Sequence, residues 1–285
     1  IIPLVIEQFL LMSVGMADTV MVTTAGEAAV SGVSLVDNIN TLMLQIFAAL
    51  STGGAVVVSQ YLGRKESHHA KTAAKQLLYA VTVLCSVIMI LCLIFREHLL
   101  FLIFGSINDD VMESAVVYFI STALAYPFMA LYNAGAALFR SMGNSKVSMF
   151  NSLIVNIVNI AVNAILIFGF GMGSLGAGIG TLTSRIVAAA IILFLLQHRD
   201  CVLRIEHMFR PEFHWVMVRR ILTIGIPTGL ENGLFQVGKL VVLSLITSFG
   251  TDAVAANAIA NSIAGVVNVP GQAIGLAIIT LVGQC

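Results

Sequence analysis

One carboxylate lies deep inside an apolar stretch of this sequence, where it could bind a cation. Asp18 follows Pro3 by 15 residues, which is about 22 Å along a helix that rises 1.5 Å per residue. That distance places the side chain in the outer half of a membrane span. An ionised carboxylate there costs several kcal/mol unless it is paired or hydrated, so we interpret Asp18 as a functional residue. The alternative is a surface acid at the outer end of the span, because residues 23–27 read as a loop.

Amide side chains repeat along one face of a later apolar stretch. Asn156, Asn159 and Asn163 occupy positions i, i+3 and i+7, which share one face of a helix. They could hydrogen-bond to neighbouring helices or line a wet cavity, and Asn156 is a candidate for the cavity lining. Asn163 lies about as deep as Asp18, and Thr181 of the next stretch reaches a similar level. One carboxylate with amide and hydroxyl oxygens suits Na⁺, although Asp18 could equally bind and release a proton.

Two glutamates and two basic residues inside apolar stretches are further candidates. Glu7 and Glu231 lie in the inner third of their stretches, where they could face each other as a gate or a proton entry. Hydration at the membrane interface is the alternative. Lys239, eight residues after Glu231, could pair with it, reach toward the first-span carboxylate, or line a cavity beside Gln236. Arg185 is expected to extend to the membrane surface or to cap a neighbouring helix.

The composition is that of a membrane protein. Hydrophobic residues make up 59% of the chain and charged residues 10%, and the mean hydropathy is +1.00. A soluble globular chain carries about a quarter charged residues, so this apolar content fits several membrane spans better than a soluble core. The net charge of zero gives no support for nucleic-acid binding. Cys85, Cys92, Cys201 and Cys285 have no metal-binding spacing, and the absence of a nucleophile–base set argues against an enzyme.

Apolar stretches of about 20 residues recur along the chain and predict an all-α integral membrane protein with eight spans. Between the third and fourth spans, residues 99–104 form an apolar piece too short to cross, which we expect at the interface. Residues 198–220 combine arginines with Phe209, Phe213 and Trp215, a pattern typical of an amphipathic helix on the membrane surface. The predicted spans cover residues 1–24, 36–61, 77–95, 114–138, 148–169, 176–197, 221–248 and 255–282.

Basic residues concentrate in alternate loops between the predicted spans. Eleven of the 14 lysines and arginines fall in three of these loops, whereas the opposite loops hold Arg96 and several acids. Because Lys and Arg stay on the cytoplasmic side, this asymmetry predicts a cytoplasmic N-terminus. The eleven are Arg64, Lys65, Lys71, Lys75, Arg140, Lys146, Arg199, Arg204, Arg210, Arg219 and Arg220.

The chain also repeats itself at a fixed offset of 224 residues. Pro3 matches Pro227, Glu7 matches Glu231, and further pairs extend the match to Gln60 and Gln284. Six spans separate the copies, so both enter the membrane in the same direction, as in a parallel transporter repeat. We therefore predict a six-helix lobe over residues 1–197, a cytoplasmic linker over 198–220, and the start of a second lobe over 221–285. A full repeat would have twelve spans, of which the last four are expected beyond this sequence.

Long motifs follow one another in a fixed order. They include IPLVIEQ and GMADTVMV near the start, YPFMALYNAGAALFRSMGNSKVSM and NIVNIAVNAILIFGFGMGSLGAGIGTLTSR in the middle, and IGIPTGLENGLFQVGK near the end. Over the whole chain they resemble the multidrug and toxic compound extrusion (MATE) family of transporters. The resemblance implies two six-helix lobes forming a V around a central cavity. It also implies export of diverse, often cationic amphiphiles, driven by inward movement of Na⁺ or H⁺.

The resemblance gives roles to particular positions and also shows departures. GMADTVMV aligns Asp18 with the cation-site aspartate of the family's first span. The family often has an acid where Asn163 stands, so a strict proton relay between two acids is in doubt here. Family members often carry a seventh-span acid eight residues past the proline, where this chain has Phe235.

Two rival functions remain open at this point. A lipid-linked oligosaccharide flippase of the same superfamily would have the same spans and repeat, but a cavity lined by Arg and Lys; Asp18, Glu7 and Glu231 instead favour cationic substrates. A membrane enzyme would need a clustered catalytic set. The predicted partners are the lipid bilayer and small amphipathic substrates, with no cofactor besides the coupling ion. We expect a monomer in a bacterial cell membrane.

The predicted orientation can be tested by labelling introduced cysteines. Cysteines placed near Lys71, Ser145 and Glu206 should react only with reagent added from the cytoplasm, because they adjoin the basic loops. Those placed near Glu27, Asp110 and Asp252 should react from outside, and the reverse pattern would contradict the orientation.

Overall fold

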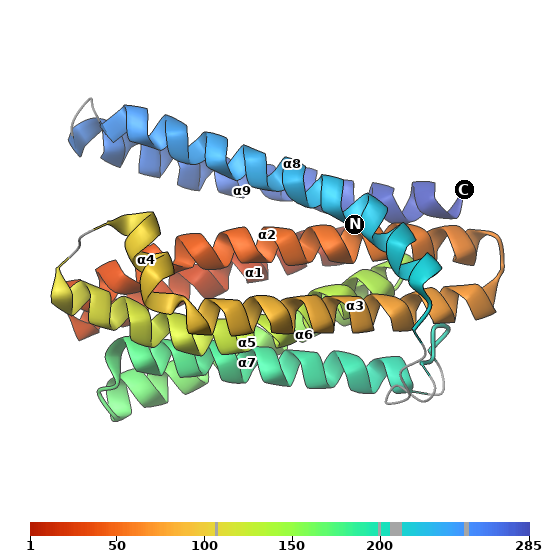
Figure 1. Ribbon diagram of the computed structural model, residues 1–285, viewed down its shortest axis with the longest axis horizontal. Coiled ribbons are helices and arrows are strands. Elements are labelled where there is room, and N and C mark those ends of the chain that lie inside the picture. Colours follow the sequence, from red (N-terminus) through yellow and green to blue (C-terminus); the bar gives the residue numbers. More distant parts are fainter. Residues whose placement is uncertain (106–107, 199–200, 206–212, 248–250) are drawn as a thin grey trace.

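The computed structural model describes residues 1–105, 108–198, 201–205, 213–247 and 251–285, and every regular element within these ranges is a helix (Figure 1). The elements are α1 (Ile2–Val22), η1 (Thr23–Ala25), α2 (Glu27–Gly63), α3 (Ser67–Ile94), α4 (Arg96–Phe104), α5 (Asp109–Ser141), α6 (Ser145–Asn163), a π-helical turn η2 (Ala164–Gly169), α7 (Gly173–Gln197), α8 (Trp215–Thr247) and α9 (Thr251–Gln284). This order confirms the predicted all-α fold.

Most of these helices are long and apolar enough to cross a membrane. Among the described residues, seven helical stretches meet that condition: Ile2–Ala25, Glu27–Gly63, Ser67–Ile94, Asp109–Ser141, Ser145–Gly169, Gly173–Gln197 and Ile263–Gln284. The remaining predicted span, the seventh (residues 221–248), falls in α8, whose 33 residues exceed the length of about 20 that a bilayer requires. Apart from α1, the helices begin earlier than predicted; α2 starts at Glu27 instead of residue 36, and α3 at Ser67 instead of residue 77. The first turns of α2 carry serines and Asp37, which lower the hydropathy without ending the helix.

The segment between α7 and α8 corrects the predicted amphipathic helix. Residues 201–205 form turns, and Trp215 begins the long helix α8. Leu203 and Ile205 are buried, and the Ile205 nitrogen donates a hydrogen bond to the Leu196 carbonyl of α7 at 3.2 Å. Leu203 and Ile205 therefore pack into the core instead of lying on one face of a surface helix, whereas Phe213 and Trp215 are exposed. Phe209 lies outside the described residues. The short helix α4 occupies the predicted interfacial segment.

Helix α5 lies in the middle of the first lobe, in contact with α2, α3, α6 and α7. Its Tyr118, Phe119 and Tyr126 are buried, and the Tyr126 ring meets the edge of Phe47 from α2 at a centroid distance of 5.6 Å. The outer face of α3 instead exposes Val83, Val87, Ile90 and Ile94, which are spaced along one face of the helix. Large exposed apolar side chains at that spacing are the lipid-facing surface of a membrane helix.

Helices α8 and α9 run beside the first lobe and separate from α2 toward the end where α4 lies (Figure 1). At the other end the two lobes are in close contact. A Cβ atom on Gly53 of α2 would lie 2.6 Å from the Ile221 carbonyl oxygen and 2.7 Å from the Gly225 nitrogen of α8. The Gln284 side chain of α9 donates to the Ser141 carbonyl at 2.7 Å. The lobes thus form a V that is closed at the loop 64–66 and open at the loop 23–26.

Gly53→Ala tests the close helix crossing. The added methyl group must push α2 and α8 apart, and overpacking of this kind costs about 1–3 kcal/mol, so the melting temperature of the purified protein should fall. Gly15→Ala is the control, because its added Cβ would meet no described atom of another helix within 4 Å and Ala favours a helix over Gly. Equal melting temperatures for the two variants would contradict the crossing.

Candidate cation-binding site

Three helices bring the four predicted site residues together. Asp18 comes from α1, Asn159 and Asn163 from α6, and Thr181 from α7. Asp18 is 5% exposed, the two asparagines are fully buried and Thr181 is 7% exposed. Contacts of α1 with α6 and of α6 with α7 hold these side chains in one interior cluster.

Hydrogen bonds join both carboxylate oxygens of Asp18 to this cluster. The Asn163 Nδ2 atom donates to Asp18 Oδ1 at 2.5 Å and to Asn159 Oδ1 at 3.3 Å. The Thr181 hydroxyl donates to Asp18 Oδ2 at 3.4 Å. Within the described ranges, Asp18 has no basic side chain in an ion pair. Among the described residues, the carboxylate therefore accepts hydrogen bonds from neutral donors and forms no ion pair.

Backbone features of α6 and α7 place the Asn163 side chain in this cluster. Asn163 is the last residue of α6, and the π-helical turn Ala164–Gly169 follows it directly; such turns occur frequently at functional sites. Facing it on α7, Gly180 leaves the space that the amide needs, because a Cβ there would collide with Asn163 Oδ1. That oxygen is buried and has no hydrogen-bond partner among the described atoms. The site thus contains an acceptor that a bound cation could use.

Asn156 lies one turn away from the cluster and has a structural role. Its Nδ2 atom donates to the Leu10 carbonyl of α1 and to the Ser152 carbonyl of α6, both at 3.0 Å. It therefore ties α1 to α6 instead of lining a cavity, and of the two roles considered for the asparagine face, bridging between helices applies to this residue.

Glu7 is buried inside the first lobe, so it does not face Glu231 across a cytoplasmic mouth as predicted. Its Oε1 atom pairs with the Arg140 guanidinium of α5 at 2.9 Å, and its Oε2 atom accepts from the Ser148 hydroxyl of α6 at 2.6 Å. Arg140 lies 133 residues away in sequence. The carboxylate turns inward because a cation and a hydroxyl donor are available there and both of its oxygens are satisfied.

The candidate residues of α8 are not clustered with the site. Glu231 is exposed, and Lys239 is exposed with its Nζ atom 5.0 Å above the Phe235 ring. In the part of the chain that the structure describes, they form no ion pair with each other. Gln236 follows Gly229 by seven residues and shares its helix face, and Gly229 packs beside Ala49 of α2. Of the three candidates on α8, Gln236 is therefore the one on the face toward the first lobe.

Two charged residues near Asp18 differ from the sequence-based predictions. Arg185 was expected to extend to the membrane surface or to cap a helix, and Asp37 was not predicted as a site residue. Arg185 is 8% exposed and its Nε atom lacks a described hydrogen-bond partner, so it does not extend to the membrane surface. Asp37 of α2 was not singled out, because the predicted span began beside it and made it look interfacial. Both residues act electrostatically on Asp18. The repeat could have drawn attention to Asp37, since its equivalent, Asn261, is also polar.

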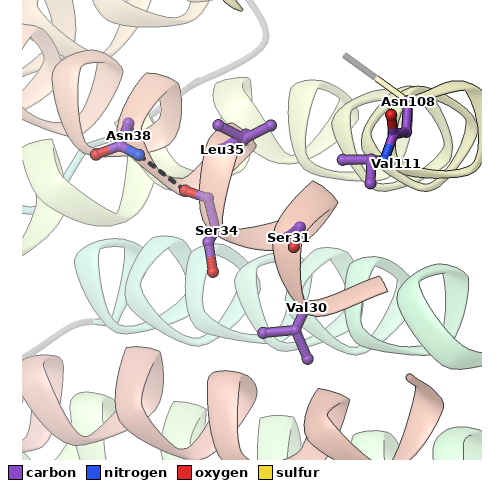
Figure 2. A pocket seen from close by; sticks show the side chains of 7 residues that line it. All are labelled: Val30, Ser31, Ser34, Leu35, Asn38, Asn108 and Val111. Atoms are coloured by element: carbon purple, nitrogen blue, oxygen red, sulfur yellow. Dashed lines mark hydrogen bonds between the residues drawn. The ribbon is translucent and has the colours of Figure 1, made fainter. Parts of the chain in front are cut away.

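A groove of about 570 Å³ opens on α2 at the end where the lobes are apart. Figure 2 shows its lining, with the Asn38 amide donating to the Ser34 carbonyl at 2.9 Å. The lining combines one side of α2 with the start of α5: Val30, Ser31, Ser34, Leu35, Asn38, Asn108 and Val111.

Comparison with known proteins gives a consistent match over the whole chain. The MatE family model matches residues 3–165 and 227–285, and these two stretches begin at Pro3 and Pro227, the first pair of the repeat. A probable multidrug resistance protein NorM of Thermotoga maritima is 27% identical over 99% of this chain and 61% of its own length. The multidrug export protein MepA of Staphylococcus saprophyticus is 26% identical over 89% of this chain and 56% of its own.

Solved structures share the fold. A MATE structure in a bent conformation superposes with a TM-score of 0.91 at 22% identity, over 99% of this chain and 63% of that one. An outward-facing multidrug resistance MATE transporter of the MOP superfamily also gives 0.91, at 23% identity and over 62% of its chain. The present chain thus spans about three-fifths of the length of the relatives it matches.

Glu7→Gln tests the buried ion pair. The variant leaves the largely buried Arg140 without its carboxylate, and we expect a loss of about 2–3 kcal/mol because Arg140 keeps some contact with solvent. Thermal unfolding of the purified protein measures the effect. The repeat-equivalent variant Glu231→Gln should change the melting temperature little, because Glu231 is exposed and unpaired in the described chain; equal losses would contradict the asymmetry.

Proposed function

Because this chain belongs to the MatE family, we propose that the full-length protein is an antiporter. It exports small amphipathic cations across a bacterial membrane in exchange for Na⁺, which binds at Asp18, Asn159, Asn163 and Thr181. The observation that carries the proposal is the Asp18 carboxylate, buried between three membrane helices with hydrogen bonds from neutral groups only. A charge left this way in a membrane protein is costly and marks an ion pathway by default.

The oxygen content of the site supports Na⁺ as the coupling ion. Asp18 offers two carboxylate oxygens, Thr181 a hydroxyl, and Asn159 and Asn163 amide oxygens, all hard donors of the kind that alkali and alkaline-earth cations prefer. The buried Asn163 Oδ1 atom has no described partner. Rotation of this amide about its terminal torsion exchanges Oδ1 with the nitrogen that now faces Asp18. A proton would bind only to the carboxylate, and the hydroxyl and amide oxygens would then have no part in binding the coupling ion.

The V of the two lobes supports alternating access to this site. The lobes touch at the Gly53 end and part at the other, and a groove opens on α2 at the parted end. With a cytoplasmic N-terminus, the described arrangement opens outward. Binding of the ion neutralises Asp18 and removes the cost of its buried charge, so the ion favours states in which the site is closed. Substrate release follows that neutralisation.

Asp18→Asn should abolish export while the protein remains folded. The amide keeps the volume of the side chain but cannot be neutralised by a cation, so gradient-driven transport has no coupling step. The test is transport by the purified full-length protein in proteoliposomes, with sodium and pH gradients imposed separately. Full transport by Asp18→Asn would refute the role of this residue.

Binding of Na⁺ can be measured separately from transport. Sodium should raise the melting temperature of the wild-type protein and slow hydrogen exchange around Asn163, because a ligand that binds only the folded state stabilises it. The shift should vanish in Asp18→Asn and weaken in Asn163→Ala. If sodium has no effect while transport follows an imposed pH gradient, the protein is a proton antiporter and the sodium assignment is wrong.

A further inference from the structure

Asp37 of α2 is a second intramembrane carboxylate, and only one of its oxygens is satisfied. Its Oδ1 atom accepts from the Tyr118 hydroxyl at 3.0 Å and from Asn40 Nδ2 at 3.3 Å. Asn40 in turn accepts from the Tyr126 hydroxyl at 3.0 Å. No described group hydrogen-bonds to Oδ2, and Asp37 is half-buried where Asp18 is buried. One oxygen is thus fixed by the lobe and the other remains available to a ligand.

The residues beside Asp37 on α2 form a polar surface. A polar, exposed stripe runs along one face of this helix at spacings of three and four residues: Ser31, Ser34, Asn38, Thr41 and Gln45. Ala49 continues the same face four residues after Gln45 and packs beside Gly229 of α8. The stripe therefore faces the second lobe and not lipid, where exposed amides and hydroxyls would be unfavourable. Asp37 borders this stripe next to Asn38, which lines the groove of Figure 2.

The two carboxylates lie in the same lobe and accept hydrogen bonds from neighbouring helices. Asp37 accepts from the Tyr118 hydroxyl of α5, and Asp18 accepts from the Thr181 hydroxyl of α7. Helices α5 and α7 are in contact, so both carboxylates belong to one packed unit. Their negative charges act on each other through a weakly screening interior.

We propose that Asp37 binds the positively charged group of the transported substrate, while Asp18 holds the coupling ion. This assignment rests on the proposed function and names the substrate class as monovalent amphipathic organic cations. The free Oδ2 atom supplies the counter-charge, and the stripe of hydroxyls and amides supplies polar contacts without a second charge. A coupling ion at Asp18 reduces the negative potential at Asp37 and so weakens the hold on a cationic substrate, which makes the two ligands antagonistic.

Replacement of Asp37 by asparagine removes the negative charge and keeps the shape of the side chain. Asp37→Asn places on α2 the residue that the second copy of the repeat carries at the equivalent position, Asn261, so it is compatible with a helix in this setting. Equilibrium binding of radiolabelled tetraphenylphosphonium to the purified full-length protein should be weakened about tenfold, the factor that corresponds to about 1.4 kcal/mol. Asp37→Glu keeps the charge and should retain binding.

Sodium-dependent thermal stabilisation separates this site from the ion site. Asp37→Asn should keep the stabilisation, whereas Asp18→Asn should lose it and bind tetraphenylphosphonium about as tightly as sodium-saturated wild-type protein does, because the negative charge at position 18 is neutralised in both. If wild-type protein binds the cation and Asp37→Asn binds it as tightly, the inference fails and the proposed function stands. If wild-type protein neither binds nor exports tetraphenylphosphonium under either gradient, both fail.

A labelling experiment covers the case in which Asp37→Asn does not fold. In an Asn38→Cys variant, bound tetraphenylphosphonium should slow modification of the new thiol by a water-soluble reagent, because the cation would occupy the adjoining part of the groove. Unchanged modification at saturating cation would overturn the inference.

Discussion

A carboxylate in the interior of a membrane protein must be paired, hydrated or neutralised, because the cost of an isolated charge there is several kcal/mol. Asp18 meets this constraint with donors that carry no charge: the Asn163 amide and the Thr181 hydroxyl. Neutral donors stabilise the carboxylate but do not cancel it, in contrast to Glu7, which is closed into an ion pair with Arg140. The two acids of α1 thus differ in their partners: Glu7 forms an ion pair, whereas Asp18 has only neutral hydrogen-bond donors. Glu7 stabilises one arrangement of the lobe, whereas we propose that Asp18 can exchange its partner.

The packing of the first lobe places the side chains that the proposed ion exchange at Asp18 requires. Asn163 ends a regular helix at the start of a π-helical turn, and Gly180 leaves room for its amide, so the side chain that faces Asp18 is placed by backbone features of two neighbouring helices. The second lobe touches α2 at the Gly53 crossing and leaves the polar stripe uncovered at the other end. Small residues allow contact where the lobes meet, and polar residues tolerate water where they part. The proposed ion site inside one lobe and the polar surface between the lobes are the two parts that the proposed antiporter needs.

The sequence predicts the Asp18 cluster well, because depth in a membrane helix follows from simple counting at 1.5 Å per residue. Asn163 and Thr181 could be placed at the level of Asp18 without knowledge of any contact, and Asn159 through its position on the same helix face as Asn163. The same counting could not predict the Glu7–Arg140 pair, since the choice of partner depends on how α1 packs against α5. Asp37 was missed because hydropathy marks the apolar part of a span and not the start of its helix. The amphipathic helix predicted over residues 198–220 was wrong at residues 201–205, because burial of Leu203 and Ile205 against the lobe outweighed the local amphipathic pattern there.

Direct binding of ²²Na⁺ to the purified full-length protein tests the central claim that Asp18 is a site of ion exchange. The account predicts saturable binding that disappears when the Asp18 carboxylate is replaced by an amide and persists when Asp37 is changed in the same way. The pair is informative because both substitutions remove one negative charge from the same lobe, so a nonspecific loss of charge would affect them alike. Sodium binding that survives without the Asp18 carboxylate, or that is absent from the wild-type protein, would contradict the account.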